Sequence, residues 1–230
     1  VGSEMCIRDR DKYQKFTGEE GYNHTMMYFT NIEGGGLTIL PIHRLVKNIM
    51  ELNAQVLIEK LRQFFEVEEF PFKTRNELNI RRKILTRIKK FPSSEHTFIL
   101  FIRGINKYFL LKLLDEKILD KIIVLERSKE WKRLDVTIAH ELIIKRILGI
   151  GGERIQNEDI GYTKNVDEAI ENVKIGKYQL AILLNPTKVS EIVAIASGKE
   201  RLPQKSTFFY PKLLTGLVMN KIFLDEKVKF

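Results

Sequence analysis

A short segment near the C-terminus gathers side chains suited to holding an anion. Residues 204–207, QKST, lie between Pro203 and an aromatic run, FFY, that Pro211 follows. Lys205 brings a positive charge and three N–H donors, and the neighbouring amide and hydroxyls add further hydrogen bonds. Such a group fits a phosphate or a carboxylate. We expect an anion-binding loop whose prolines restrict the backbone and whose aromatic rings are anchored in the core. On chemistry alone, an ordinary loop with solvated polar residues stays an alternative.

Other segments match catalytic motifs only in part. His140 begins HELII, but Ile144 stands where the zinc-protease pattern HExxH needs its second histidine, so no metal site is predicted. His140 also falls on an apolar helical stripe, which favours a hydrogen-bonded histidine in the core. The GIGG of residues 149–152 follows an expected helix rather than a strand, which indicates a helix end and not a dinucleotide loop.

Three glutamates crowd one short segment, FEVEEF at residues 65–70. A carboxylate pair for sugar chemistry must flank the substrate from two sides, and one short segment does not provide that. We therefore expect an exposed acidic strand edge.

The composition describes a globular chain without a membrane span. Of 230 residues, 43% are apolar and 30% charged, and no apolar run approaches the length of about 20 residues that a bilayer requires. The net charge of +9 invites a nucleic-acid function. Lysines spread over the surface explain the charge more simply, and no recognition-helix, RNA-recognition or zinc-finger motif is present. Nucleic acid is therefore the less favoured partner, and no membrane partner is expected.

The first nine residues, VGSEMCIRD, look like a translated sequencing adapter and are left out of the fold prediction. Residues 10–230 are expected to form a single domain or the C-terminal portion of a larger α/β protein. Leaving out residues 1–9 removes Cys6, the single cysteine, so no disulfide is expected. A chain without disulfides is consistent with the reducing cytoplasm.

Periodicity and turn residues predict the elements that must position the anion-binding loop. Strands and helices mix without strict alternation, which favours an α+β (mixed α/β) fold with a mixed sheet, hairpins and packed helices. The expected helices cover residues 53–65, 75–90 (with Arg81 on its apolar side), 136–148 (capped by Asp135), 166–176 and 187–199 (capped by Thr187). The expected hairpins pair residues 26–32 with 37–40 and 96–102 with 107–113, and the expected single strands cover 65–70, 159–165, 178–184 (central and buried) and 213–224.

The segment PQKSTFFYPKLLTGLV closely resembles the C-terminal signature of the domain-of-unknown-function 1015 family, an uncharacterised bacterial and archaeal group. Further segments agree in order: MMYFTNIEGGGLTILPIHRLVKN, LDVTIAHELIIKRILGI, YTKNVDEAI and YQLAILLNPTKV. The resemblance runs from about Asp11 to the end of the chain.

The resemblance implies three patches of site residues. They are Pro41, His43 and Arg44; Asn185 and Pro186; and Pro203, Gln204, Lys205, Ser206, Thr207, Tyr210 and Lys212. The family also carries an upstream Asp-Gly-His-His-Arg segment, so the chain is expected to be an N-terminally truncated, C-terminal fragment. That upstream segment is similar to the phosphate-gripping arginine motif of the ParB/sulfiredoxin-like superfamily, which includes nucleotide-dependent enzymes and a free-serine kinase.

Together these features predict a protein that binds a nucleotide or a phosphorylated small molecule. A small-molecule kinase is the specific hypothesis for the full-length protein, with ATP or another nucleotide and Mg²⁺ as the cofactor. Lys205 would neutralise phosphate charge, while Ser206 and Thr207 would orient phosphate oxygens or assist the metal ion. The alternative is a non-catalytic regulatory or nucleic-acid-binding protein that uses the basic surface.

Overall fold

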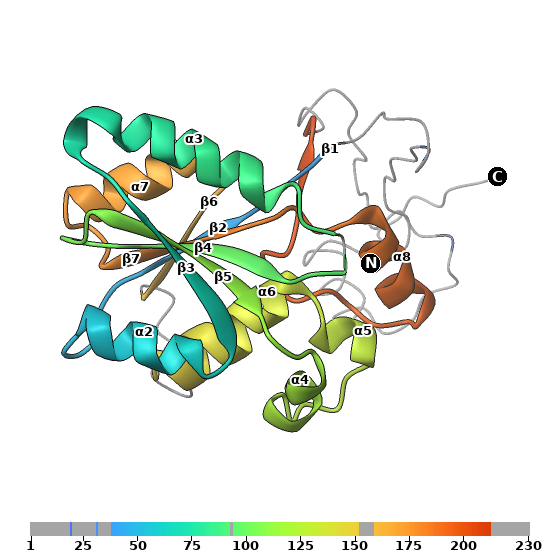
Figure 1. Cartoon of the computed structure of the whole chain (residues 1–230). Coiled ribbons are helices and arrows are strands. Elements are labelled where there is room, and N and C mark those ends of the chain that lie inside the picture. The colour runs from blue at the N-terminus through green and yellow to red at the C-terminus, as the bar shows by residue number, and fades with distance from the viewer. Residues whose placement is uncertain (1–18, 20–30, 32–37, 93, 152–158, 213–230) are drawn as a thin grey trace. The chain divides into compact units, whose positions relative to one another are not determined.

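A computed structural model describes Glu19, Asn31 and residues 38–92, 94–151 and 159–212 (Figure 1). The chain divides into two compact units, one formed by Val1–Thr38 with Pro211–Phe230 and the other by Ile39–Tyr210. Several predicted elements lie outside the described residues: the strand at 26–32 with its glycine turn, and the strand at 213–224. The elements below belong to the second unit, apart from Thr38.

A six-stranded sheet with the order β3-β5-β4-β7-β2-β6 is the centre of this unit. Its neighbouring strands are antiparallel throughout, whereas the sequence predicted a mixed sheet. Its strands are β2 (His43–Val46), β3 (Phe65–Pro71), β4 (Thr97–Ile102), β5 (Lys107–Leu113), β6 (Ile160–Thr163) and β7 (Leu180–Leu184). A separate two-stranded sheet joins β1 (Thr38–Leu40) to β8 (Phe208–Tyr210).

Helices cover both faces of the six-stranded sheet (Figure 1). On one face lie α3 (Glu77–Ile88), preceded by the turn η2 (Thr74–Asn76), and α7 (Val166–Lys174). On the other lie α2 (Ala54–Arg62), α6 (Asp135–Thr137) and its continuation η3 (Ile138–Ile147), a π-helix in which the Leu148 N–H donates to the Ile143 carbonyl at 2.9 Å. The remaining helices are α4 (Lys117–Ile122), α5 (Lys129–Lys132) and α8 (Val189–Ser197). None of the helices in the described part of the chain is long and apolar enough to span a bilayer.

The α+β class is confirmed, and several local predictions hold. The β4–β5 hairpin forms as expected, with Gly104 at a φ of +77° in its turn. β7 is buried along its whole length between β4 and β2, as its run of apolar residues predicts. β3 lies at one end of the strand order, so its glutamates form the exposed acidic edge that we expected.

Three predictions about side chains are wrong. Asp135 does not cap α6, which has no side-chain cap. The Asp135 carboxylate instead lies 2.7 Å from Nδ1 of His96. Thr187 does not cap α8 either: the Glu191 carboxylate accepts the Lys188 N–H at 2.8 Å, which leaves the Thr187 hydroxyl for another partner. The rings of the FFY run are not in the core, since the two phenylalanines are half-buried and Tyr210 is 54% exposed.

Candidate anion-binding site

Two of the predicted patches contact each other directly, and the third adjoins them. Arg44, which is buried on β2, donates through Nη2 to the carbonyl oxygen of Lys205 at 3.0 Å. Nδ1 of its neighbour His43 accepts the N–H of Leu184 at 3.2 Å, one residue before Asn185. The N-terminal end of β2, the C-terminal end of β7 and the QKST loop therefore meet, although they are far apart in the sequence.

The QKST loop is held by hydrogen bonds to its backbone. The Thr187 hydroxyl donates to the Ser206 carbonyl at 3.0 Å, and the buried Ser206 hydroxyl donates to the Pro203 carbonyl at 2.5 Å. Lys205 has a φ of +56°, a left-handed conformation that costs a non-glycine residue about 1 kcal/mol or more. The hydrogen bond from Arg44 to the Lys205 carbonyl helps to hold this conformation. Lys205 itself is exposed. The Ser206 hydroxyl is engaged within the loop itself.

Burial controls the ionisation of His43 and Arg44. Burial, assisted by the charge of Arg44, lowers the pKa of His43 to about 4, so the imidazole is neutral at pH 7. Since Nδ1 accepts a hydrogen bond, the proton lies on Nε2, which is buried and has no hydrogen-bond partner among the described residues. Burial lowers the pKa of Arg44 to about 10, and its guanidinium, 5.6 Å from the Tyr162 ring, stays charged.

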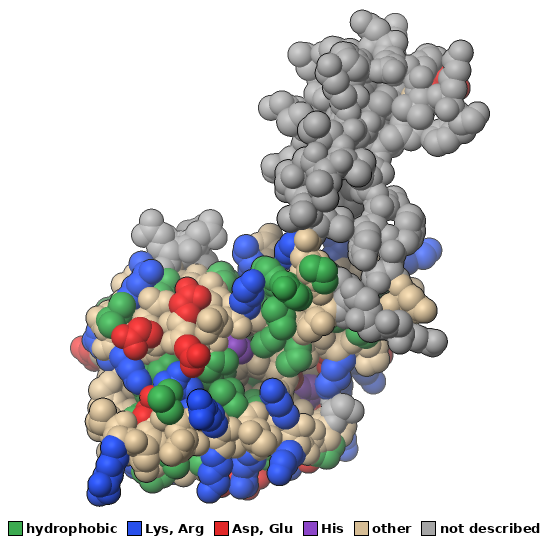
Figure 2. All heavy atoms as spheres, turned by 90° about the horizontal axis from the view of Figure 1, so that it is seen from above, with side chains coloured by type: hydrophobic (Ala, Val, Ile, Leu, Met, Phe, Trp, Pro, Cys, Tyr) green, Lys and Arg blue, Asp and Glu red, His purple; other side chains and the backbone are tan. Residues whose placement is uncertain are grey.

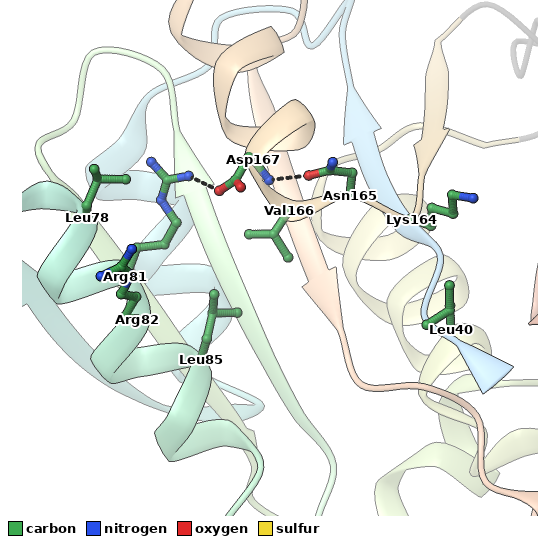
Figure 3. A pocket seen from close by; sticks show the side chains of 9 residues that line it. All are labelled: Leu40, Leu78, Arg81, Arg82, Leu85, Lys164, Asn165, Val166 and Asp167. Atoms are coloured by element: carbon green, nitrogen blue, oxygen red, sulfur yellow. Dashed lines mark hydrogen bonds and ion pairs between the residues drawn. The ribbon is translucent and has the colours of Figure 1, made fainter. Parts of the chain in front are cut away.

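A cavity of about 550 Å³ lies between α3, the start of α7 and β1 (Figure 3), and we call it the α3–α7 cavity. Its lining brings three cations, Arg81, Arg82 and Lys164, against the single carboxylate of Asp167. Arg81 pairs with Asp167 at 2.5 Å, so the surplus positive charge comes from Arg82 and Lys164. The rest of the lining is Leu40, Leu78, Leu85, Asn165 and Val166.

The α3–α7 cavity adjoins the segment that follows the QKST loop. Leu40 belongs to β1, which pairs with β8, and Nζ of Lys164 lies 4.2 Å from the centre of the Phe208 ring. His43 is on the same face of the sheet as this cavity, because it lies two residues before Leu45 on β2 and Leu45 packs against the apolar side of α7. In the sheet register, His43 pairs with Thr163 on the neighbouring strand β6, and Thr163 directly precedes Lys164 in the sequence.

A buried polar cluster joins α3, β5 and α7 beside the cavity, and we call it the Glu77 cluster. Glu77 accepts from Nε and Nη2 of Arg81 at 2.8 and 2.7 Å, from Nζ of Lys174 at 3.0 Å, and from the hydroxyl of Tyr108. Burial by itself would raise the pKa of Glu77, but the hydrogen bonds from Arg81, Tyr108 and Lys174 lower it to about 2. The cluster explains why an arginine lies on the apolar side of α3.

The other predicted site residues are placed as follows. Asn185 is half-buried at the end of β7 and donates through Nδ2 to the Thr97 hydroxyl at 3.2 Å. Gln204 and Tyr210 are exposed and Thr207 is half-buried, whereas Lys212 belongs to the other compact unit. His140 is half-buried on η3, and burial lowers its pKa.

Sequence reasoning missed Arg82 and Lys164 as candidates. They are 82 positions apart and belong to no shared motif. The one local signal was the high density of basic residues on the expected helix 75–90, which we took for a solvated face. Figure 2 supports that interpretation for most of the charge, because Lys and Arg are spread over the visible face together with Asp and Glu.

The fold and the cavity define an α+β protein with a six-stranded antiparallel sheet and a cationic cavity on one face. A family model described as "Protein of unknown function (DUF1015)" matches residues 3–137, more than half of the chain. The chain belongs to this family, as its resemblance implied. No curated protein and no solved structure matches it. Kinship with the ParB/sulfiredoxin-like superfamily stays a prediction.

Proposed function

We propose that the protein binds a nucleotide or a phosphorylated metabolite in the α3–α7 cavity. The observation that supports this most is the lining of three cations against one carboxylate around about 550 Å³. Small-molecule sites enclose roughly 300–1,000 Å³. A concave surface with surplus positive charge attracts phosphate more strongly than the same charges spread over a convex surface.

Side chains rather than the end of α7 would hold the phosphate. The Asn165 carboxamide oxygen already accepts the N–H groups of Asp167 and Glu168 at 2.8 and 3.3 Å, and both of these residues bring negative charge to the first turn. The α7 terminus is therefore a poor anion site. Arg82 and Lys164 would pair with the phosphate, while the apolar part of the lining would contact the organic part of the ligand.

Phosphoryl transfer to a small molecule is the enzymatic form of this proposal. Such transfer depends on positioning the phosphate and stabilising its charge, which cationic side chains supply. Among the described residues, no group of three or more His, Cys, Asp or Glu could hold a metal ion. Mg²⁺ would enter bound to the nucleotide phosphates, as it commonly does in such enzymes.

Isothermal titration with ATP, AMP and pyrophosphate, each with and without Mg²⁺, tests the proposal. We expect saturable binding that Arg82→Ala or Lys164→Ala weakens at least about tenfold, because a hydrogen bond to a charged group contributes roughly 1.5–3 kcal/mol. Lys83→Ala is the matched control: Lys83 is an exposed cation on α3 that does not line the cavity, so affinity should stay unchanged.

Two results would contradict the proposal. One is the absence of binding by all three ligands at millimolar concentration. The other is an equal loss of affinity in the Lys83 variant, which would indicate diffuse attraction. Tight binding of an oligonucleotide with a steep dependence on salt would instead favour the nucleic-acid alternative, since that binding releases counterions from the phosphate backbone.

A further inference from the structure

A second cavity, of about 250 Å³, lies near the start of β4, between α8 and the segment that holds α4 and α5. We call it the His96 cavity. The side chains that matter for its chemistry are His96, Glu116, Glu130, Arg133 and Glu191. It shares no lining residue with the α3–α7 cavity and is independent of the function proposed above.

The imidazole of His96 is buried, with 6% of the residue exposed, and its two nitrogens have different surroundings. Nδ1 lies 2.7 Å from the Asp135 carboxylate, so it must donate its proton to that group. In the neutral ring, Nε2 is then an acceptor. It lies 3.3 Å from Oε1 of Glu116, yet makes no hydrogen bond among the described residues.

With a neutral imidazole, Nε2 of His96 and Oε1 of Glu116 are two acceptors that face each other. Two lone pairs at this distance repel unless a donor joins them. The distance allows an ion pair if the imidazole takes up a proton, although the geometry is not that of a hydrogen bond. Without that proton, the donor must come from a ligand.

The cations close to the cavity are already engaged. Arg133 donates through Nε to Oε2 of Glu116 at 3.0 Å and through Nη1 and Nη2 to Asp120 at 3.3 and 3.1 Å. Nζ of Lys188 lies 3.4 Å from Glu191. Because the lining brings three carboxylates against one guanidinium, the His96 cavity is negative and rich in acceptors.

We propose that the His96 cavity binds a small molecule through its primary ammonium group. An ammonium carries three donors and no acceptor, so it can donate to Nε2 of His96 and Oε1 of Glu116 at once. Its charge balances the surplus of carboxylates, including the exposed Glu130, which a neutral hydroxyl cannot do. The volume equals that of about eight water molecules, which is ample for a small primary amine such as ethanolamine.

An NMR titration of the imidazole C–H resonances tests this proposal, since the chain has four histidines to assign. Ethanolamine is the probe, ethylene glycol replaces its ammonium by a hydroxyl, and choline keeps the charge but has no N–H donor. We expect ethanolamine to shift the His96 resonance saturably at millimolar concentration and the other two compounds to leave it in place. Glu116→Gln should weaken ethanolamine binding at least about tenfold, the loss of one charge-assisted contact.

Glu141→Gln is the matched control for that variant. Glu141 pairs with Lys145 at 2.6 Å on η3 and does not line the cavity, so the affinity for ethanolamine should stay unchanged. Should Glu116→Gln fail to fold, Glu130→Gln tests the same charge at an exposed position and should weaken binding in the same direction. A His96 resonance that does not respond to ethanolamine, or responds equally to ethylene glycol, would overturn the proposal. So would full affinity in a folded variant at Glu116 or, if that variant does not fold, at Glu130.

Discussion

The Glu77 cluster and the two buried histidines, His43 and His96, differ in how completely their polar atoms are paired. In the Glu77 cluster, the carboxylate accepts from Arg81, Lys174 and Tyr108. Each histidine instead has one ring nitrogen engaged, while its Nε2 is buried with no hydrogen-bond partner among the described residues.

This difference separates a saturated structural cluster from buried groups that can still take a hydrogen-bond partner. A fully paired buried cluster joins the elements it connects and has no capacity left for a ligand. A buried polar atom without a partner costs free energy, and such atoms in folded proteins call for an explanation such as a ligand or a bound water. The Glu77 cluster therefore fixes Arg81 in the lining of the α3–α7 cavity, whereas His43 and His96 each keep a buried nitrogen without a hydrogen-bond partner among the described residues.

The largest expected effect is the loss of the Glu77 cluster. Glu77→Ala should lower the free energy of unfolding by about 3–5 kcal/mol, because it leaves the buried Arg81 charge without its main partner. Denaturant unfolding measures this. The control is Glu68→Ala, which breaks an exposed pair with Arg87 and should cost less than about 1 kcal/mol. Equal costs would show that the cluster is no more than a surface ion pair.

The next largest effect is the dependence of folding stability on pH that His43 causes. Its pKa is lowered by burial from 6.5 to about 4, so the unfolded chain binds the proton more tightly than the folded one. Stability from this group is present above about pH 6.5 and is lost as the pH falls through 4, a loss of about 3 kcal/mol. Unfolding measured from pH 7 to 4 should show this decline in the natural chain and a shallower decline in His43→Gln. Parallel curves would mean that His43 is not buried as a neutral ring.

A smaller effect is expected for the QKST loop. Lys205 does not line the α3–α7 cavity, so the variant Lys205→Ala tests the separate prediction, made from the sequence, that Lys205 contacts a phosphate. On that prediction, the variant should weaken an anionic ligand by about 1.5–3 kcal/mol, with little change in the free energy of unfolding, because the residue is exposed. Titration and denaturant unfolding of one variant give both values. Unchanged affinity would assign the loop a structural role only.

The smallest effect is expected for the aromatic run. Phe209→Ala would cost about 3–5 kcal/mol if the ring lay in the core, as the sequence suggested. Because Phe209 is half-buried on β8, we expect a loss of about 1–2 kcal/mol. Denaturant unfolding decides between these values, and a loss in the higher range would place the ring in a core after all.

Local patterns in the sequence were enough to predict most of the elements. Asn53 and Gly176 mark the ends of helices in the sequence, and both do so in the structure: Asn53 caps α2 through its side chain, and Gly176 follows α7 at a φ of +83°. Spacing along the chain determines these features, since a helix or a turn forms between residues close in sequence. The resemblance likewise identified the family and singled out His43, Arg44 and Lys205.

What the sequence by itself determined is therefore the family, the α+β class, the β4–β5 hairpin and the buried course of β7. Only the tertiary structure decided which charges face each other. It brought Arg82 and Lys164 into the lining of one cavity, closed the Glu77 cluster with Tyr108 and Lys174, and set Glu116 against His96. The physical reason is that helix and strand periods record which side of an element is buried, but not which distant element covers it. Pairing between such elements depends on the packing of the whole sheet.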